Sequence, residues 1–157
     1  MSLPVLLRDV ADEVDALGDE WCSRINRTTG ELAGATSDHW TLAAETTKDN
    51  PRNQPQWEQD LLADLRKVLD SDDWLVLPGK DELDEYRVME EFCHTVENRL
   101  LRDELTHAIV GKGAFRRFKT VIERNNIREK WFEFRDLELL KVVREWLNVN
   151  KIPFRET

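Results

Sequence analysis

Residues 21–36 read WCSRINRTTGELAGAT, and this stretch decides the fold class. Trp21, Ser23 and Ile25 alternate with polar neighbours, a pattern typical of a half-buried β-strand. The letters RTTGE then provide a turn that contains glycine, and Leu32 begins a second apolar run. The stretch therefore predicts a β-hairpin in a chain whose other patterns are mostly helical.

The segments on either side of the hairpin combine helical spacing with one further strand. Apolar residues recur every three or four positions over residues 3–17, and Gly18 is a natural stop for that helix. The same spacing returns from residue 57 to about residue 70. Residues 73–77 form a short apolar run that ends at Pro-Gly, and we expect this run to be a third, buried strand.

From residue 81 onward the apolar spacing is helical throughout. A last helix over residues 128–149 either continues unbroken or breaks near Asp136, which could act as an internal N-cap. We expect the aromatic side chains after residue 110 to be mostly buried against the apolar residues of the first helix after residue 81. The expected core brings Phe115, Phe118, Trp131, Phe134 and Trp146 against Tyr86, Met89 and Phe92.

Together these patterns predict an α+β fold, with residues 1–157 forming one mostly helical domain. A small three-stranded antiparallel sheet is expected to pack on one side against a C-terminal helical bundle. Residues 41–56 are polar and contain two prolines, so they are expected to form a short helix or none, followed by a mobile loop. A chain of 157 residues can bury enough surface to fold without a disulfide or a metal, and we expect no cofactor.

The charge of the chain is strongly acidic but unevenly distributed. It has 32 acidic and 23 basic side chains, which gives a net charge of −9. An acidic chain repels nucleic acid unless its charges are segregated. Residues 81–110 hold nine carboxylates and three arginines, whereas residues 111–130 hold seven cations and two carboxylates. Nucleic-acid binding is therefore a possible function of one segment, although it is not the favoured one.

The sequence indicates a cytoplasmic protein without a membrane segment. No apolar run approaches the roughly 20 residues of a membrane span. The N-terminal stretch is acidic and lacks the basic start and small-residue cleavage site of a secretory signal. Two cysteines, Cys22 and Cys93, are too few for a disulfide framework, and we expect buried thiols in a reducing compartment.

Three motifs carry a resemblance to a known family. DELDEYRVMEEF, GKGAFRRFK and WFEFRDLELLKVVREWL follow one another in this order and spacing. Over about residues 81–148 the chain resembles the bacterial uncharacterised protein family 0158. The hairpin with its TTGE turn is similar to that family more loosely, and the stretch around residues 41–56 lies outside the resemblance. The resemblance implies a bacterial protein without an assigned activity, so it transfers no catalytic residues.

The segment GKGAFRRFK, residues 111–119, admits two interpretations besides a catalytic role. A helix that begins near Ala114 leaves N–H groups unpaired, and neighbouring cations would complete a site for phosphate or nucleic acid. It is not a P-loop, because no strand precedes it and no hydroxyl follows. Alternatively, at least one of these cations pairs with a carboxylate of the preceding helices. We expect Arg116 to form this pair and Arg117 to turn towards solvent. The candidate anion-binding residues are Lys112, Arg116, Arg117 and Lys119.

Other candidate sites are weaker. Glu90 and His94 share a helix face, but no pattern of metal ligands accompanies them, so no metal site is predicted. No serine lies in the context of a nucleophile, and we identify no catalytic residues. Trp40 and Trp57 flank the polar stretch, where they either cover a small core or form an exposed anchor for a partner.

Three functions remain open. The favoured one is a non-enzymatic module for protein–protein interaction, either a homodimer or an accessory of another protein. The second is binding of nucleic acid or a phosphate ligand through the basic residues 112–130. The third is an enzyme with a pocket between the sheet and the helices, which would require converging polar groups.

Overall fold

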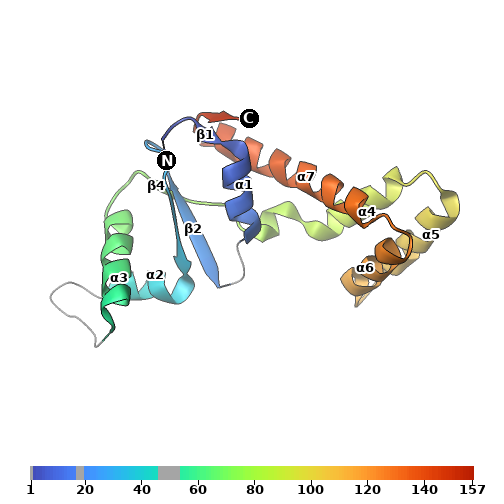
Figure 1. The fold of residues 1–157 in the computed structure, drawn as a ribbon, viewed down its shortest axis with the longest axis horizontal. Coiled ribbons are helices and arrows are strands. Elements are labelled where there is room, and N and C mark those ends of the chain that lie inside the picture. The colour runs from blue at the N-terminus through green and yellow to red at the C-terminus, as the bar shows by residue number, and fades with distance from the viewer. Residues whose placement is uncertain (1, 17–19, 46–53) are drawn as a thin grey trace. The chain divides into compact units, whose positions relative to one another are not determined.

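The computed structural model describes residues 2–16, 20–45 and 54–157 and shows a mostly helical α+β fold (Figure 1). It contains a small three-stranded antiparallel sheet, as the sequence predicts. The predicted fold class is therefore confirmed.

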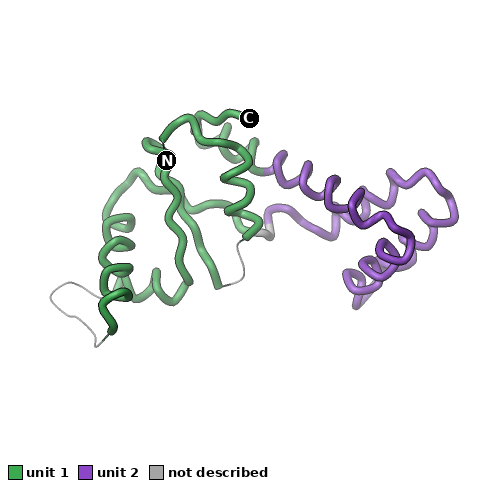
Figure 2. Tube along the Cα trace, in the orientation of Figure 1, with its two compact units in different colours: residues 1–80, 143–157 green, residues 81–142 purple. Residues whose placement is uncertain are grey.

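The chain divides into two compact units, which are coloured separately in Figure 2. Unit 1 comprises residues 1–80 and 143–157, and unit 2 comprises residues 81–142. A single domain over the whole chain stays a prediction, because it concerns whether the two units unfold together. The packing of the sheet on the C-terminal bundle likewise stays a prediction.

The antiparallel sheet of unit 1 has the strand order β3-β2-β4. In the middle strand, Ile25 lies opposite Leu32 on one side and Leu75 on the other, and its side chain is fully buried. Both the hairpin and the third strand are thus confirmed. The strands span Trp21–Asn26 (β2), Leu32–Thr36 (β3) and Trp74–Val76 (β4).

The prediction that the third strand is buried is wrong. Trp74 and Leu75 are only half-buried, and Val76 is 51% exposed. The strand lies at the edge of the sheet, where only one neighbour covers it, and full burial begins at Leu77 just after it.

A glycine completes the turn of the hairpin. Oδ1 of Asn26 accepts hydrogen bonds from the N–H groups of Thr28 and Thr29, at 2.8 and 3.0 Å. Gly30 has a φ of +80°, and a Cβ atom there would lie 2.6 Å from Cγ1 of Val5. Glycine is therefore required both by the backbone conformation and by the available space.

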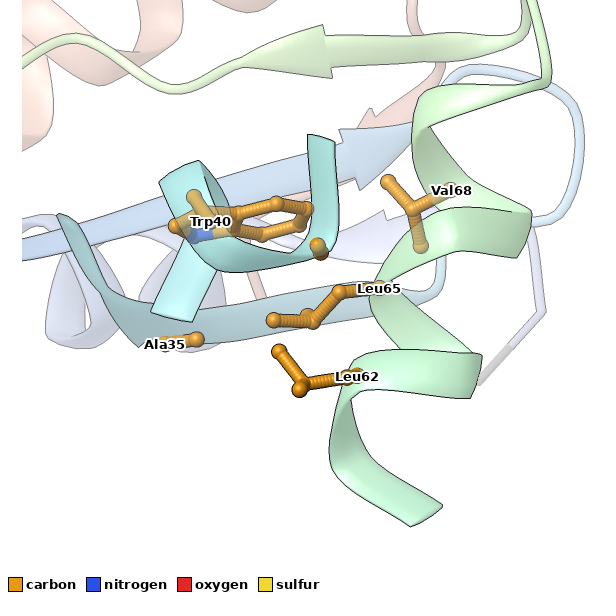
Figure 3. Close-up of a cluster of buried hydrophobic side chains, with 6 residues drawn as sticks. Ala35, Trp40, Leu62, Leu65 and Val68 are labelled. Carbon is orange, nitrogen blue, oxygen red and sulfur yellow. The ribbon is translucent and has the colours of Figure 1, made fainter. Parts of the chain in front are cut away.

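Two helices, α2 (Ser37–Glu45) and α3 (Gln56–Leu69), pack on one face of the sheet. Figure 3 shows Leu62 and Leu65 of α3 pointing towards Trp40 of α2. Because the sheet contributes to the same cluster, these helices form the layer that covers it within unit 1. We call this cluster the helix–sheet core; its buried members are Ala35, Trp40, Ala43, Leu62, Leu65 and Val68.

Helix α2 decides between the two alternatives for the start of residues 41–56 in favour of a short helix, since residues 41–45 are helical. The helix begins where Oγ1 of Thr36 accepts a hydrogen bond from the backbone N–H of His39, at 3.2 Å. Trp40 and Ala43, three positions apart, both face the core. The part of the predicted loop between residues 46 and 53 lies outside the described residues.

The opposite face of the sheet meets helix α1 (Leu7–Ala16). Successive side chains of a strand point to opposite faces, so Ser23 points away from the helix–sheet core. Its hydroxyl is buried and donates a hydrogen bond to Glu13 of α1. The predicted helix over residues 3–17 is thus confirmed from Leu7 onward, while its predicted stop at Gly18 lies outside the described residues.

A second, parallel pairing joins the two ends of the chain within unit 1. Strand β1 (Val5–Leu6) pairs with strand β5 (Phe154–Arg155), and Val5 is fully buried. Strands of two residues carry no readable periodicity, which explains why the sequence analysis places these residues in a helix or leaves them unassigned.

Unit 2 contains three helices and the first part of a fourth. The long helix α7 is continuous, so the alternative of a break near Asp136 is wrong. Arg135 of α7 forms an ion pair with Glu85 at the start of α4 and so connects these two helices. The helices span Glu85–Thr95 (α4), Arg99–Ala108 (α5), Ala114–Arg124 (α6) and Arg128–Val149 (α7), with a short 3-10 helix η1 (Lys80–Leu83) before them.

Three aromatic rings form the centre of unit 2, and we call them the aromatic core. The rings of Phe118 and Trp131 meet edge to face, with centroids 4.8 Å apart. Phe92 contacts both rings in the same manner, at 6.0 and 5.4 Å. Burial of Phe118, Trp131 and Phe92 confirms this part of the predicted core.

The predicted burial of two other aromatic residues is wrong. Tyr86 is 41% exposed and Phe115 is 45% exposed. Phe115 lies one position beside the buried stripe of α6, so the helical turn carries it towards the surface. Phe134 is half-buried against Phe92, and Trp146 is half-buried within unit 1.

Candidate functional site

Unit 2 contains a hollow of about 660 Å³, which we call the unit 2 groove. It lies between the end of α4, the start of α5 and the first half of α7. Its apolar lining residues are Phe92, Val96, Leu101, Ile127, Phe134 and Leu137, and its polar ones are Thr95, Glu97, Asn98, Lys130 and Glu133.

The connection from α4 to α5 shapes one wall of the groove. Helix α4 ends where the hydroxyl of Thr95 donates a hydrogen bond to the carbonyl oxygen of Phe92, at 2.7 Å. The side chain of Asn98 begins α5 by accepting a hydrogen bond from the N–H of Leu101, at 3.1 Å. The extended residues between these two ends hold Val96 at the groove.

The floor of the groove is continuous with the aromatic core. Phe92 is 4% exposed, and its ring lies 5.6 Å from the ring of Phe134, which is half-buried. Leu137, one turn further along α7, is 65% exposed. The groove thus leads from a packed interior to an uncovered leucine, an arrangement that suits the binding of apolar side chains.

The polar residues of the groove do not form a catalytic arrangement. Glu97, Lys130 and Glu133 are solvent-exposed. Catalytic carboxylates usually lie in settings that shield them from water. Exposed charges around an apolar floor instead match the polar rim of a binding surface.

A smaller hollow of about 150 Å³ in unit 2 brings together Cys93, His94 and Glu90. Burial raises the pKa of the Cys93 thiol to about 11, so the sulfur is protonated at neutral pH and is a poor nucleophile and metal ligand. Among the described residues, no group of three or more His, Cys, Asp or Glu side chains is placed to hold a metal ion. The pair Glu90 and His94 therefore gains no third ligand.

Arg117 has an internal role that the sequence analysis did not foresee. Its guanidinium donates hydrogen bonds to the carbonyl oxygens of Ala108, Val110 and Lys112, at 2.8, 2.5 and 2.5 Å. These carbonyls lie at the end of α5 and in the turn that leads to α6. Arg117 is exposed, as the sequence predicts, but its guanidinium also braces this turn through the three hydrogen bonds.

Arg116 does not form the ion pair predicted for it. Within the part of the chain that the structure describes, no carboxylate pairs with Arg116, Arg117 or Lys119. The pair that joins the basic segment to the preceding helix is formed by Arg124 and Glu104. Arg124 is the last residue of α6, and Glu104 belongs to α5.

The two candidate tryptophans have opposite environments. Trp40 is 7% exposed, and its Nε1–H donates to the carbonyl oxygen of Cys22 at 2.9 Å, so it is a core residue and not an anchor for a partner. Trp57 is 62% exposed, and its ring lies edge to face with the ring of His39, at 6.2 Å between centroids. Of the pair, Trp57 alone remains a surface candidate.

Sequence reasoning missed the unit 2 groove, although one signal for it was present. The letters VENRLL, residues 96–101, interrupt two helical stripes with a short polar connection. Leu100 is 82% exposed and Leu101 is partly buried at the groove, so the doubled leucine indicated more apolar surface than one stripe can bury.

Comparisons with known proteins complete this description. None of the helices in the described part of the chain is long and apolar enough to cross a membrane. Neither the curated proteins nor the solved structures include a match. The family match spans residues 52–156, so it extends the resemblance at residues 81–148 to include α3 and β4, and it leaves the hairpin outside. Since this match covers more than half of the chain, the protein belongs to the uncharacterised protein family UPF0158.

Proposed function

We propose that this protein is a non-enzymatic interaction module of the bacterial cytoplasm that binds a segment of a partner protein in the unit 2 groove. The single observation that supports this function is an apolar hollow of about 660 Å³ with exposed charges around it. Apolar surface of this kind on a folded unit is characteristic of binding sites for other proteins.

The chemistry of the groove favours an amphipathic helix as the bound segment. Phe134 and Leu137 lie three positions apart on α7, and Leu101 faces them from α5. Such spacing accommodates the large apolar anchors that a helix presents at every third or fourth residue. Glu97 and Glu133 would flank basic residues of the partner at the rim.

The proposed location is supported by the cysteines. Cys93 is buried, Cys22 is partly buried, and both are free thiols. Free thiols are the usual state of cysteine in a reducing compartment.

Site-specific photocrosslinking in bacterial cells tests the proposed function. A benzoylphenylalanine residue is placed at Leu137 in the groove and, as a matched control, at Val149 near the other end of the same helix, which is 79% exposed. We expect one protein to crosslink at Leu137 and not at Val149. The crosslinked partner, once identified and purified, should bind the natural chain in solution. The substitution Leu137→Glu in the chain should weaken this binding at least tenfold.

Two results would contradict the proposal. Equal crosslinking at both positions would mean that exposure alone explains the product. An identified protein that binds the Leu137→Glu variant as tightly as the natural chain would mean that the groove is not its site. Crosslinking to a second copy of the chain, confirmed by sedimentation, would replace the heterologous partner with a homodimer.

A further inference from the structure

Helix α6 turns one face towards the aromatic core and another towards solvent. Its buried side carries Ala114, Phe118, Val121 and Ile122. The exposed side carries Arg116 and Lys119, three positions apart, with the half-exposed ring of Phe115 beside them. An exposed lysine lies in the turn before the helix. We call these four residues the α6 face: Lys112, Phe115, Arg116 and Lys119.

The cations of the α6 face remain without carboxylate partners in an acidic surrounding. Residues 81–142 contain fourteen carboxylates and twelve cations. Even so, among the described residues no ion pair involves Lys112, Arg116 or Lys119. The nearest acid on the same side of the helix is Glu123, one turn beyond Lys119, so the face keeps a local excess of positive charge.

The turn before α6 is held rigidly. Gly113 adopts a φ of +79° and directs the chain into the helix. The three hydrogen bonds of Arg117 fix the carbonyl groups of this turn, including that of Lys112. Arg117 is therefore a positioning residue, and the α6 face is ordered before any ligand arrives, which reduces the entropy lost on binding.

We propose that the α6 face binds single-stranded nucleic acid. A single strand alternates phosphate anions with flat bases, and the α6 face places cations around one exposed aromatic ring. Proteins that bind single strands combine these two elements, with cations along the backbone and aromatic side chains that stack on bases. An acidic peptide would engage Lys112, Arg116 and Lys119 but would leave the ring of Phe115 without a matching group.

This surface differs from the one that carries the proposed function. None of the four residues of the α6 face lines the unit 2 groove. Binding at one surface can therefore fail while binding at the other persists, and the two proposals are tested by different substitutions.

Fluorescence anisotropy with labelled 12-nucleotide oligo-dT and oligo-rU tests the proposal on the full chain. Three phosphate contacts predict a slope of about −2 in log K against log salt, which is about 20-fold weaker binding at 200 mM than at 50 mM salt. Phe115→Ala removes the stacking ring and should weaken binding roughly 5- to 150-fold. Lys119→Glu should weaken it more than Lys67→Glu, a control that makes the same charge change on α3 of unit 1.

We expect each variant to keep its fold, because all the substituted side chains are exposed or half-exposed. Thermal unfolding of each variant checks this. Four results would overturn the proposal. They are no binding at 50 mM salt, equal weakening by Lys119→Glu and Lys67→Glu, unchanged affinity in Phe115→Ala, and displacement of the oligonucleotide by poly-glutamate at equal charge concentration. The last result would assign the α6 face to an acidic protein segment.

Discussion

The two units bury their apolar side chains by different means. Unit 1 forms its core between a hydrogen-bonded sheet and two helices, with Trp40, Leu62 and Leu65 at the centre. Unit 2 has only helices among its described residues, and the edge-to-face rings of Phe118 and Trp131 hold them together. A sheet fixes its strands through the backbone, whereas helices are positioned by their side chains alone.

The difference extends to the surface. Unit 2 is the smaller unit, yet among the described residues it exposes six large apolar side chains where unit 1 exposes four. Uncovered apolar side chains next to a groove indicate a surface for partners. The comparison therefore supports the proposal that places partner binding in unit 2. Its exposed side chains are Tyr86, Leu100, Val110, Phe115, Phe132 and Leu137, and those of unit 1 are Trp21, Trp57, Val76 and Val149.

The largest expected effect tests whether the two cores are energetically separate. Phe118→Ala in unit 2 should lower the free energy of unfolding by about 3–5 kcal/mol, and Leu62→Ala in unit 1 by about 2–5 kcal/mol, because both side chains are 1% exposed. Urea unfolding followed by circular dichroism measures these losses. If the chain is one domain, each substitution should also lower hydrogen-exchange protection in the other unit. A loss of hydrogen-exchange protection confined to the substituted unit would contradict the prediction of a single domain.

A medium effect concerns the brace in unit 2. Arg117→Met removes three hydrogen bonds to carbonyl groups and should lower the free energy of unfolding by about 1–3 kcal/mol. The neighbouring Arg116→Met makes the same chemical change on the exposed face, where the expected loss is below about 0.5 kcal/mol. Equal losses in denaturant titrations would show that the brace adds nothing to stability.

A smaller effect depends on pH. Burial raises the pKa of Cys93 to about 11 in the folded chain, above its ordinary value of 9.0, so folding favours the protonated thiol. Its contribution to stability is fully present below about pH 9 and is lost as the pH rises towards 11. Unfolding free energies measured across this window should fall by roughly 2 kcal/mol more in the natural chain than in Cys93→Ala. Parallel curves for the two proteins would rule out this thiol as the cause.

The smallest effect sharpens the contrast between core and surface within unit 1. Trp57 is 62% exposed, and Trp57→Ala should change the free energy of unfolding by less than about 0.5 kcal/mol. Scanning calorimetry measures this change. A large loss would mean that Trp57 belongs to the helix–sheet core together with Trp40.

Much of the fold was predictable because it depends on local periodicity. The alternation at Trp21, Ser23 and Ile25 identified the hairpin, and regular apolar spacing identified α3 and α7. The pairing of Val5 with Phe154 was not predictable, since it joins distant two-residue segments without a pattern of their own. Helix α2 was predicted only as one of two alternatives because most of its side chains are small or polar, and its burial depends on α3 and the sheet, which are distant in the sequence or carry no signal within α2 itself.

The candidate site was only partly predictable, for a geometric reason. The sequence identified the cations of GKGAFRRFK, but it predicted an ion pair for Arg116 that is absent from the described residues, and it did not predict the three hydrogen bonds of Arg117. Helical spacing places both arginines on the exposed side of α6, but it does not specify the path of the preceding turn, so the carbonyl groups that Arg117 reaches could not be predicted. The unit 2 groove depends on how the connection at Val96 packs beside α7, which no local pattern records.

The aromatic core also provides unit 2 with an intrinsic fluorescence probe. Trp131 is the only tryptophan between residues 81 and 142, whereas the other five lie in unit 1. Its indole contacts Phe92, which lines the groove, and Phe118, which belongs to α6. If the five other tryptophans are replaced by phenylalanine, the emission spectrum of the chain becomes an optical signal from unit 2, and a ligand in the groove can be followed without a label.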